Sequence, residues 1–145
     1  MKTPLQLRED HPHKHGRNCT DCGVFKLASE FNLERDIKAV GGVTMRAQCR
    51  PCREHVKWKS FIQRTYGINA EEYYDMLAAQ DNKCAICESE EVNNSRISSG
   101  KLFIDHCHDT GKVRGLLCSK CNHSIGLLND DVDLLRKAID YLTNS

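Results

Sequence analysis

Residues 102–124 read LFIDHCHDTGKVRGLLCSKCNHS, and this stretch decides the fold of the second half of the chain. Two short apolar runs flank the turn residues DTG at 109–111, which is the pattern of a β-hairpin. Ser119 is a good helix N-cap, so we expect a helix over 120–128 directly after the second strand. The order strand, turn, strand, helix predicts a ββα unit within a small α+β protein.

Eight of the nine cysteines form four CxxC pairs, and the ninth, Cys107, stands alone. Two thiolates separated by two residues in a tight turn can bind one tetrahedral ion, and two such turns complete its coordination. Redox dithiols are the alternative, but a redox CxxC normally occurs once, in a thioredoxin-like pattern. Pairing in chain order predicts two structural zinc sites, one of Cys19, Cys22, Cys49 and Cys52 and one of Cys84, Cys87, Cys118 and Cys121. Such sites are closed to substrate, so catalysis must lie elsewhere.

The composition agrees with a zinc-stapled fold. Of the 145 residues, 39% are hydrophobic and 6% aromatic, so we do not expect a large apolar core, and small units would need staples that the cysteines can supply. No apolar run has the length of a membrane span or of a signal-peptide core. We therefore expect a cytoplasmic protein with no membrane partner, in a compartment where disulfides are rare.

Charge is distributed unevenly along the chain. Residues 1–68 hold 13 Lys and Arg against 7 Asp and Glu, a net charge of +6, whereas residues 69–145 hold 8 against 13, a net charge of −5. The net charge of +1 for the whole chain conceals this difference. A polyanion such as nucleic acid would therefore meet the first half more readily.

The sequence predicts four segments. Residues 1–16 contain three histidines amid charged residues and are expected to be a flexible arm, with a metal-binding histidine tract as the alternative. Residues 17–56 are expected to form a zinc-ribbon-like module, and residues 57–82 connecting helices. Residues 83–145 are expected to form the ββα module with a C-terminal helix.

A basic helix is expected between the first zinc site and the ββα module. It follows Pro51, extends to about Tyr66, and carries Arg53, Lys57 and Lys59. We expect these three side chains to contact nucleic acid.

Two further helices are predicted from capping residues and apolar spacing. Asn69, with Glu72 three residues later, has the pattern of a capping box, and the helix it begins should end near Gln80. Apolar residues at helical spacing predict a last helix over 130–142, capped by Asp130. We expect this helix to pack against the module, with a dimer helix as the alternative.

The second half of the chain resembles the phage recombination endonuclease VII branch of the HNH (ββα-metal) nucleases. The residues that carry the resemblance are CAIC at 84–87 and FIDHCHDTGKVRGLLCSKCNHSIGLLNDD at 103–131, preceded by the lead-in YYDMLAAQDNK, and it covers about residues 71–142. The stretches NCTDCGVFKLASEF and QCRPCREH are similar to zinc-ribbon extensions that precede this domain in phage proteins.

The resemblance implies catalytic roles that also agree with elementary chemistry. Asp105 and Asn122 would supply hard oxygen ligands to Mg²⁺ or Mn²⁺. His106 would be the general base that takes a proton from the attacking water, because imidazole titrates near neutral pH. His108 would lie in the active site and contact the substrate, with a structural hydrogen bond as the alternative. Arg114 is a candidate phosphate contact, with a solvated strand residue as the alternative.

The pair Asp105 and His106 poses a geometric problem. Successive side chains of a regular strand point to opposite faces, so both can serve one site only if the strand ends or bends there. The polar residues before Gly111 allow such a bend.

The resemblance predicts a metal-dependent DNA endonuclease, phage-encoded and active in the host cytoplasm, that hydrolyses phosphodiester bonds. It would act as a junction, nicking or homing-type nuclease, as a monomer or weak homodimer. The alternative is a non-catalytic two-zinc protein that binds nucleic acid or has a regulatory role. A zinc-ribbon interaction module within a phage complex is a third hypothesis, but it leaves the basic helix unexplained.

Overall fold

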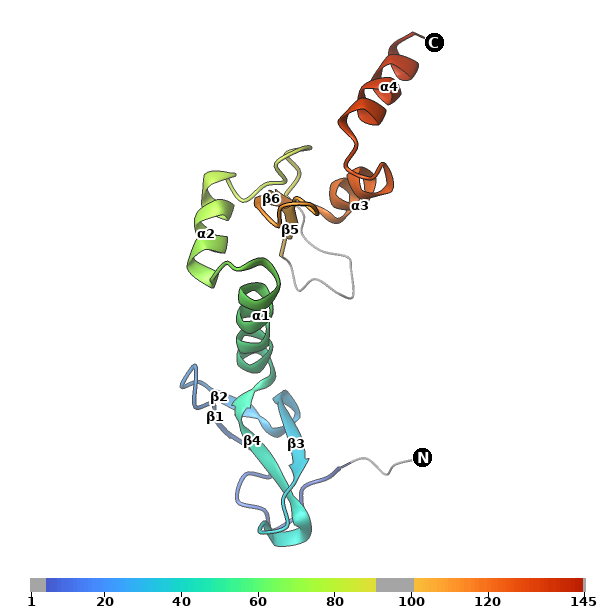
Figure 1. Ribbon diagram of the computed structural model, residues 1–145. Coiled ribbons are helices and arrows are strands. Elements are labelled where there is room, and N and C mark those ends of the chain that lie inside the picture. Colours follow the sequence, from blue (N-terminus) through green and yellow to red (C-terminus); the bar gives the residue numbers. More distant parts are fainter. Residues whose placement is uncertain (1–4, 91–100, 145) are drawn as a thin grey trace. The chain divides into compact units, whose positions relative to one another are not determined.

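The structure, a computed structural model, describes residues 5–90 and 101–144 (Figure 1). The chain divides into two compact units, Met1–Phe61 and Ile62–Ser145. The predicted arm and the predicted ββα module include residues 1–4, 91–100 and 145, which lie outside the described residues. The four predicted segment boundaries stay predictions.

The first unit consists of two antiparallel hairpins and the start of a long helix. Gly16–Asn18 (β1) pairs with Phe25–Leu27 (β2), and Phe31–Arg35 (β3) pairs with Val43–Cys49 (β4). Two 3₁₀ turns, Ala28–Glu30 and Val40–Gly42, join these strands. Helix α1, Arg50–Tyr66, begins immediately after β4, close to where the sequence predicts it.

The core of the first unit forms around its cysteines. Cys19 and Cys49 are buried with Phe31 and Met45, and Leu7 packs against this cluster. Leu7 belongs to the predicted arm, whose described residues also make backbone hydrogen bonds, for example from the amide of His11 to the carbonyl of Arg8 at 3.1 Å.

The second unit contains the predicted ββα order. Helix α2, Ala70–Ala79, precedes the hairpin of β5 (Phe103–His106) and β6 (Val113–Leu117), which α3 (Ser119–Leu127) and α4 (Val132–Thr143) follow. The buried residues of the unit come from α1, α2 and the hairpin with its flanking loops. They are Ile62, Tyr73, Cys84, Leu102, Ile104, Asp105, Leu116, Leu117 and Cys118.

A glutamine at the end of α2 connects that helix to the hairpin. The side chain of Gln80 accepts a hydrogen bond from the amide of Leu116 at 2.9 Å and donates one to the carbonyl of Leu116 at 2.8 Å. Gly115 lies beside it, since a Cβ there would be 3.1 Å from Gln80 Oε1. The glycine therefore allows the close approach between α2 and β6.

The structure corrects two predicted caps and one predicted packing. The N-cap of α3 is Cys118, not Ser119, and the N-cap of α4 is Asp131, not Asp130. No residue of α4 is buried, and Tyr141 is 78% exposed, so the helix does not pack against the module along its length as expected. Val132 and Leu135 in its first turn border a pocket that Leu117 and Ile125 also line. Among the described residues, no helix is long and apolar enough to span a membrane.

Candidate active site and zinc sites

The structure brings the cysteines together in the two predicted groups of four. In each group all four Sγ atoms lie within 4.8 Å of one another. In the first group, the hairpin β1–β2 presents Cys19 and Cys22, while the end of β4 and the first turn of α1 present Cys49 and Cys52. Both sets of thiols therefore suit a tetrahedral zinc ion.

Backbone amides favour the thiolate form in the first group. The amides of Cys49 and Asp21 donate to Cys19 Sγ at 3.3 and 3.4 Å. Hydrogen bonds from backbone amides, that of Cys49 first, lower the pKa of Cys19 to about 6. The hydrogen bond with Cys49 and burial raise the pKa of Cys52 to about 12. The thiol of Cys52 would therefore lose its proton when a cation binds to the group.

The second group holds the ββα unit at its two ends. The loop of Cys84 and Cys87 is tied to β6 by the amide of Ala85, which donates to the carbonyl of Leu116 at 3.0 Å. Cys118 directly follows β6, and its Sγ accepts from the amide of Cys121 at 3.4 Å, which caps α3. Zinc here would therefore fix the angle between the hairpin and α3.

Ser89 contacts a cysteine of this group, and no pattern in the sequence indicated this contact. Its hydroxyl lies 3.0 Å from Cys87 Sγ. The hydrogen bond from Ser89 lowers the pKa of Cys87 to about 6. Burial raises the pKa of Cys121. Like the first group, this group therefore combines a thiol that ionises easily with one that keeps its proton.

A register shift lies where the sequence required a bend. Asp105 is opposite Gly115, but His106 is opposite Val113, so Arg114 is an extra residue on β6. A bulge of this kind increases the local twist and redirects side chains. The bulge therefore allows the side chains of Asp105 and His106 to depart from the opposite directions that a regular strand would give them.

Three of the four predicted catalytic residues line one pocket. Asp105, His108 and Asn122 border a pocket of about 250 Å³. The fourth, His106, is not on its wall, but its ring lies 5.0 Å from the ring of His108. On another side, the ring of Tyr66 packs edge-on against His106 at 5.2 Å. Tyr66 lies 40 positions earlier in the chain, and no sequence signal marked it.

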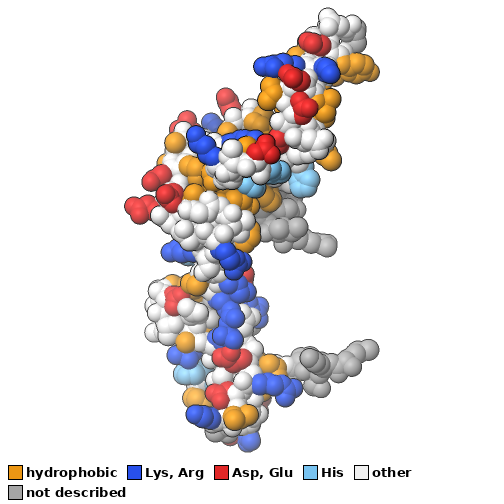
Figure 2. Space-filling model, in the orientation of Figure 1, with side chains coloured by type: hydrophobic (Ala, Val, Ile, Leu, Met, Phe, Trp, Pro, Cys, Tyr) orange, Lys and Arg blue, Asp and Glu red, His pale blue; other side chains and the backbone are white. Residues whose placement is uncertain are grey.

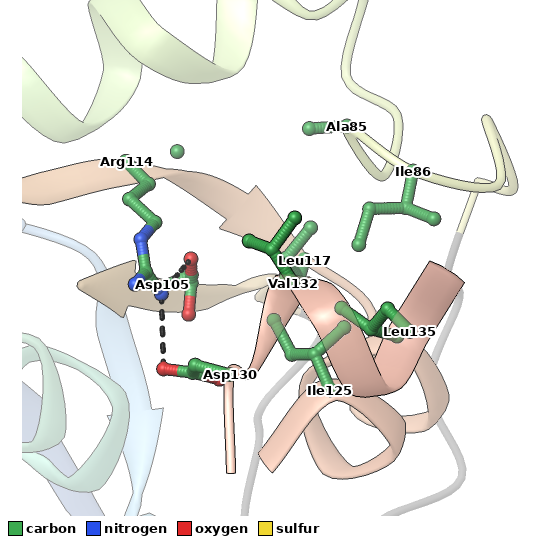
Figure 3. A pocket seen from close by; sticks show the side chains of 10 residues that line it. Ala85, Ile86, Asp105, Arg114, Leu117, Ile125, Asp130, Val132 and Leu135 are labelled. Carbon is green, nitrogen blue, oxygen red and sulfur yellow. Dashed lines mark hydrogen bonds and ion pairs between the residues drawn. The ribbon is translucent and has the colours of Figure 1, made fainter. Parts of the chain in front are cut away.

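Arg114 connects the pocket to the loop after α3. Its NH1 donates to Asp105 Oδ2 at 3.4 Å and to Asp130 Oδ2 at 3.1 Å, two contacts that Figure 3 shows in a second pocket beside the first. The same NH1 donates to the carbonyl of His106 at 3.3 Å. The hydrogen bond to Asp130, aided by Asp105, raises the pKa of Arg114. Asp130 was expected to be a helix cap, and its contact with Arg114 was not predicted.

The donor set around the pocket fits a hard divalent cation. Asp105 is 9% exposed, and Arg114 contacts its Oδ2. Asn122, in the first turn of α3, lines the same pocket, and its side chain carries an amide oxygen. A second carboxylate, that of Asp130, also borders the pocket and accepts a hydrogen bond from Arg114. The carboxylate of Asp105 and the amide oxygen of Asn122 suit Mg²⁺ or Mn²⁺ and leave other positions open for water and phosphate.

The basic residues of α1 lie on two faces. Arg53 and Lys57 are four residues apart and share a face, whereas Lys59 lies on a different one. Lys59 borders a groove with Asp21 and His55. Lys57 also pairs with Glu54 at 2.7 Å. Figure 2 shows Lys and Arg side chains gathered over α1.

The hairpin, α3 and the four-cysteine site together define a small ββα module with a site suited to structural zinc. The sequence profile of recombination endonuclease VII matches residues 59–144, more than half of the chain, and the chain belongs to this family. The resemblance seen in the sequence is thereby confirmed, and family membership supports a nuclease.

Similar proteins occur in phages. The Gene 59 protein of Mycobacterium phage D29 is 36% identical over 144 residues, covering 97% of this chain and 81% of that protein. The Gene 59 protein of Mycobacterium phage L5 is 36% identical over 146 residues, covering 99% and 83%. Among solved structures, the ββα-Me type II restriction endonuclease Hpy99I matches with 26% identity and a TM-score of 0.34, over 90% of this chain and 66% of that one.

Proposed function

We propose that the chain is a metal-dependent endonuclease that hydrolyses phosphodiester bonds of DNA at the pocket of Asp105, His108 and Asn122. The observation that carries the proposal is the convergence of these residues from β5, the turn after it and α3 on one pocket, with His106 against His108. Family membership supports the same chemistry.

The two oxygen donors would hold the cation at the junction of hairpin and helix. Asp105 and Asn122 would bind Mg²⁺ or Mn²⁺. When bound, the ion would supply stabilisation of charge on the scissile phosphate and on the leaving 3′ oxygen.

His106 would accept the proton of the attacking water. Its ring contacts the rings of Tyr66 and His108, which limits the orientations it can adopt. General-base catalysis needs the base within hydrogen-bond reach of the proton it removes, so this restraint would serve the proposed base. His108 lines the pocket and would contact the phosphate or orient His106.

Phosphate contacts outside the pocket would come from basic side chains. Arg114 uses NH1 for its three intramolecular contacts, and its other terminal nitrogen would contact a phosphate oxygen. Arg53, Lys57 and Lys59 would bind the DNA backbone along α1. The substrate would be branched DNA or a duplex cut by nicking or at a homing-type site.

The test is incubation of the pure protein with supercoiled plasmid and with a four-way junction, with and without Mg²⁺. Wild type should cut only with the ion and leave a 5′ phosphate and a 3′ hydroxyl. His106→Ala and Asn122→Ala should lose activity with zinc content and fold intact, while His15→Ala serves as a histidine control outside the site. Binding without cleavage in wild type would favour the non-catalytic two-zinc protein instead.

A further inference from the structure

Asp130 is an enclosed carboxylate in the loop between α3 and α4. Its side chain is 16% exposed. Its backbone has φ of 55°, a left-handed conformation that Asn, Asp and Gly tolerate better than other residues. Its amide donates to the carbonyl of Ile125 at 3.0 Å, so the loop folds back on the end of α3 and fixes the carboxylate.

The contact between Asp130 and Arg114 joins the two elements that carry the proposed cation ligands. Asp105 lies on β5, and Asn122 lies on α3. Asp130, at the end of the loop that follows α3, holds the guanidinium that also contacts Asp105 and the carbonyl of His106. A change in the position of Asp130 would therefore move Arg114 relative to both Asp105 and the bulge.

The charges of the three side chains also matter. Asp105, Asp130 and Arg114 together carry a net charge of −1, which attracts a cation. Without Asp130 the remaining pair is neutral, and Arg114 can then occupy the oxygens of Asp105. A guanidinium and a divalent ion compete for the same carboxylate, so a second carboxylate that retains the guanidinium favours binding of the ion.

We propose that Asp130 is a positioning residue that holds Arg114 away from full pairing with Asp105 and so keeps Asp105 available to the cation. The inference rests on the proposed function for its catalytic consequence, but cation binding tests it separately. If Asp130 had a purely structural role, its substitution would change the free energy of unfolding and leave the affinity for the ion unchanged.

The test compares neutralisation of two neighbouring aspartates in the full, zinc-loaded chain. Asp130→Asn removes the charge and suits the left-handed backbone, as does Asp130→Gly, which removes the side chain altogether. Asp131→Asn is the matched control, because it removes the same charge one residue away and asparagine remains a good N-cap for α4. Binding of Mn²⁺ is measured by electron paramagnetic resonance, and cleavage is measured against Mn²⁺ concentration.

Asp130→Asn should raise the Mn²⁺ concentration for half-saturation by about 10-fold and Asp130→Gly by up to about 100-fold, the usual range for a partner of a metal ligand. Asp131→Asn should match wild type. High Mn²⁺ should restore cleavage by both Asp130 variants. In a double variant with Arg114→Ala, Asp130→Gly should add little to the effect of Arg114→Ala alone, because the two residues act together.

The inference would be overturned if both Asp130 variants bound Mn²⁺ as tightly as wild type. It would also be overturned if the effects of Asp130→Gly and Arg114→Ala on Mn²⁺ affinity were fully additive. Either result would leave the proposed nuclease intact. Saturable Mn²⁺ binding without cleavage by wild type would overturn the proposed function alone. No saturable binding of Mn²⁺ by wild type would overturn both.

Discussion

At the scale of single residues, two side chains from distant parts of the chain support the proposed site. Tyr66 packs against His106, and Asp130 accepts a hydrogen bond from Arg114. Both reach the site through tertiary contacts that no local pattern encodes. Asp105, His106 and Asn122 could be singled out in the sequence because each has a fixed place in the strand, turn and helix order.

The bulge at Arg114 illustrates the same division. Sequence reasoning required a bend near Asp105, because a regular strand would separate Asp105 from His106. It placed the flexibility in the polar residues after His106, whereas the structure has the register shift on the opposite strand. Gly115 beside Arg114 was the available signal, since isolated glycines in strands often mark bulges.

His106→Ala and Asn122→Ala should fail in different ways. Loss of a general base typically costs about 10²- to 10⁴-fold in rate, and raised pH should partly restore His106→Ala because hydroxide replaces the base. Raised Mg²⁺ or Mn²⁺ should partly restore Asn122→Ala, in which Asp105 remains. Plasmid cleavage measured across pH and across metal concentration separates the two. Identical rescue patterns would mean that the assigned roles are wrong.

Tyr66→Leu should lower the cleavage rate without changing Mn²⁺ affinity. The ring of Tyr66 packs against His106, so its loss lets the imidazole leave its working orientation, at a cost of about 10- to 100-fold. Single-turnover cleavage at saturating Mn²⁺ measures the effect. Tyr74→Leu is the matched control, because Tyr74 is 44% exposed on α2 and contacts Lys101. Equal effects of the two substitutions would exclude a specific role for Tyr66.

At the scale of elements, local signals predicted the helix starts better than the packing. The capping box at α2 forms as expected, with Glu72 donating its amide to Asn69 Oδ1 at 3.0 Å. The cap of α3 was mispredicted because a thiol of the second four-cysteine group, Cys118, takes the position that usually belongs to a hydroxyl. The exposure of α4 was mispredicted because amphipathic spacing indicates an apolar face and not what covers it.

Gln80→Ala should destabilise the second unit. The side chain satisfies both the amide and the carbonyl of Leu116, a residue with no exposed surface. Leaving a buried amide without a partner costs about 1–3 kcal/mol. Chemical denaturation of the zinc-loaded protein measures the change. Gln63→Ala is the control, since Gln63 makes its hydrogen bond to Gly67 on the exposed side of α1, and equal stabilities of the two variants would contradict the prediction.

At the scale of the whole molecule, the two four-cysteine groups would bind zinc and so take the place of a large core in both units. The CxxC spacing predicted both four-cysteine groups, because ligand spacing is a local property of the sequence. Elemental analysis should give about two zinc ions per chain, and Cys118→Ser should unfold the ββα module, since binding energy in small metal sites is folding energy. A value near one ion would mean that one group does not bind zinc.

Acid should release the zinc and unfold the protein. Hydrogen bonding lowers the pKa of Cys19 and of Cys87 to about 6 from an ordinary value of 9.0. A lowered pKa stabilises the folded state above the ordinary value, and the stabilisation is lost as pH falls through about 6. Protons compete with zinc for these thiolates, so zinc release, followed with a chromogenic chelator beside circular dichroism, should rise as the pH falls. Ser89→Ala should move the release from the second site to higher pH.

The opposite charges of the two halves predict which part of the molecule gives DNA binding its salt dependence. Replacing Arg53, Lys57 and Lys59 together with Gln should weaken binding and flatten the plot of log affinity against log salt by about 0.9 for each phosphate that the variant no longer neutralises. Lys59 lies on a different face of α1 from Arg53 and Lys57. Lys59→Gln alone should therefore flatten the salt dependence less than the double substitution of Arg53→Gln and Lys57→Gln. Arg136→Gln with Lys137→Gln on α4 is the control for loss of charge in the acidic half. If the triple variant keeps the wild-type affinity and slope, α1 presents only a solvated face and the DNA must be held by the ββα module.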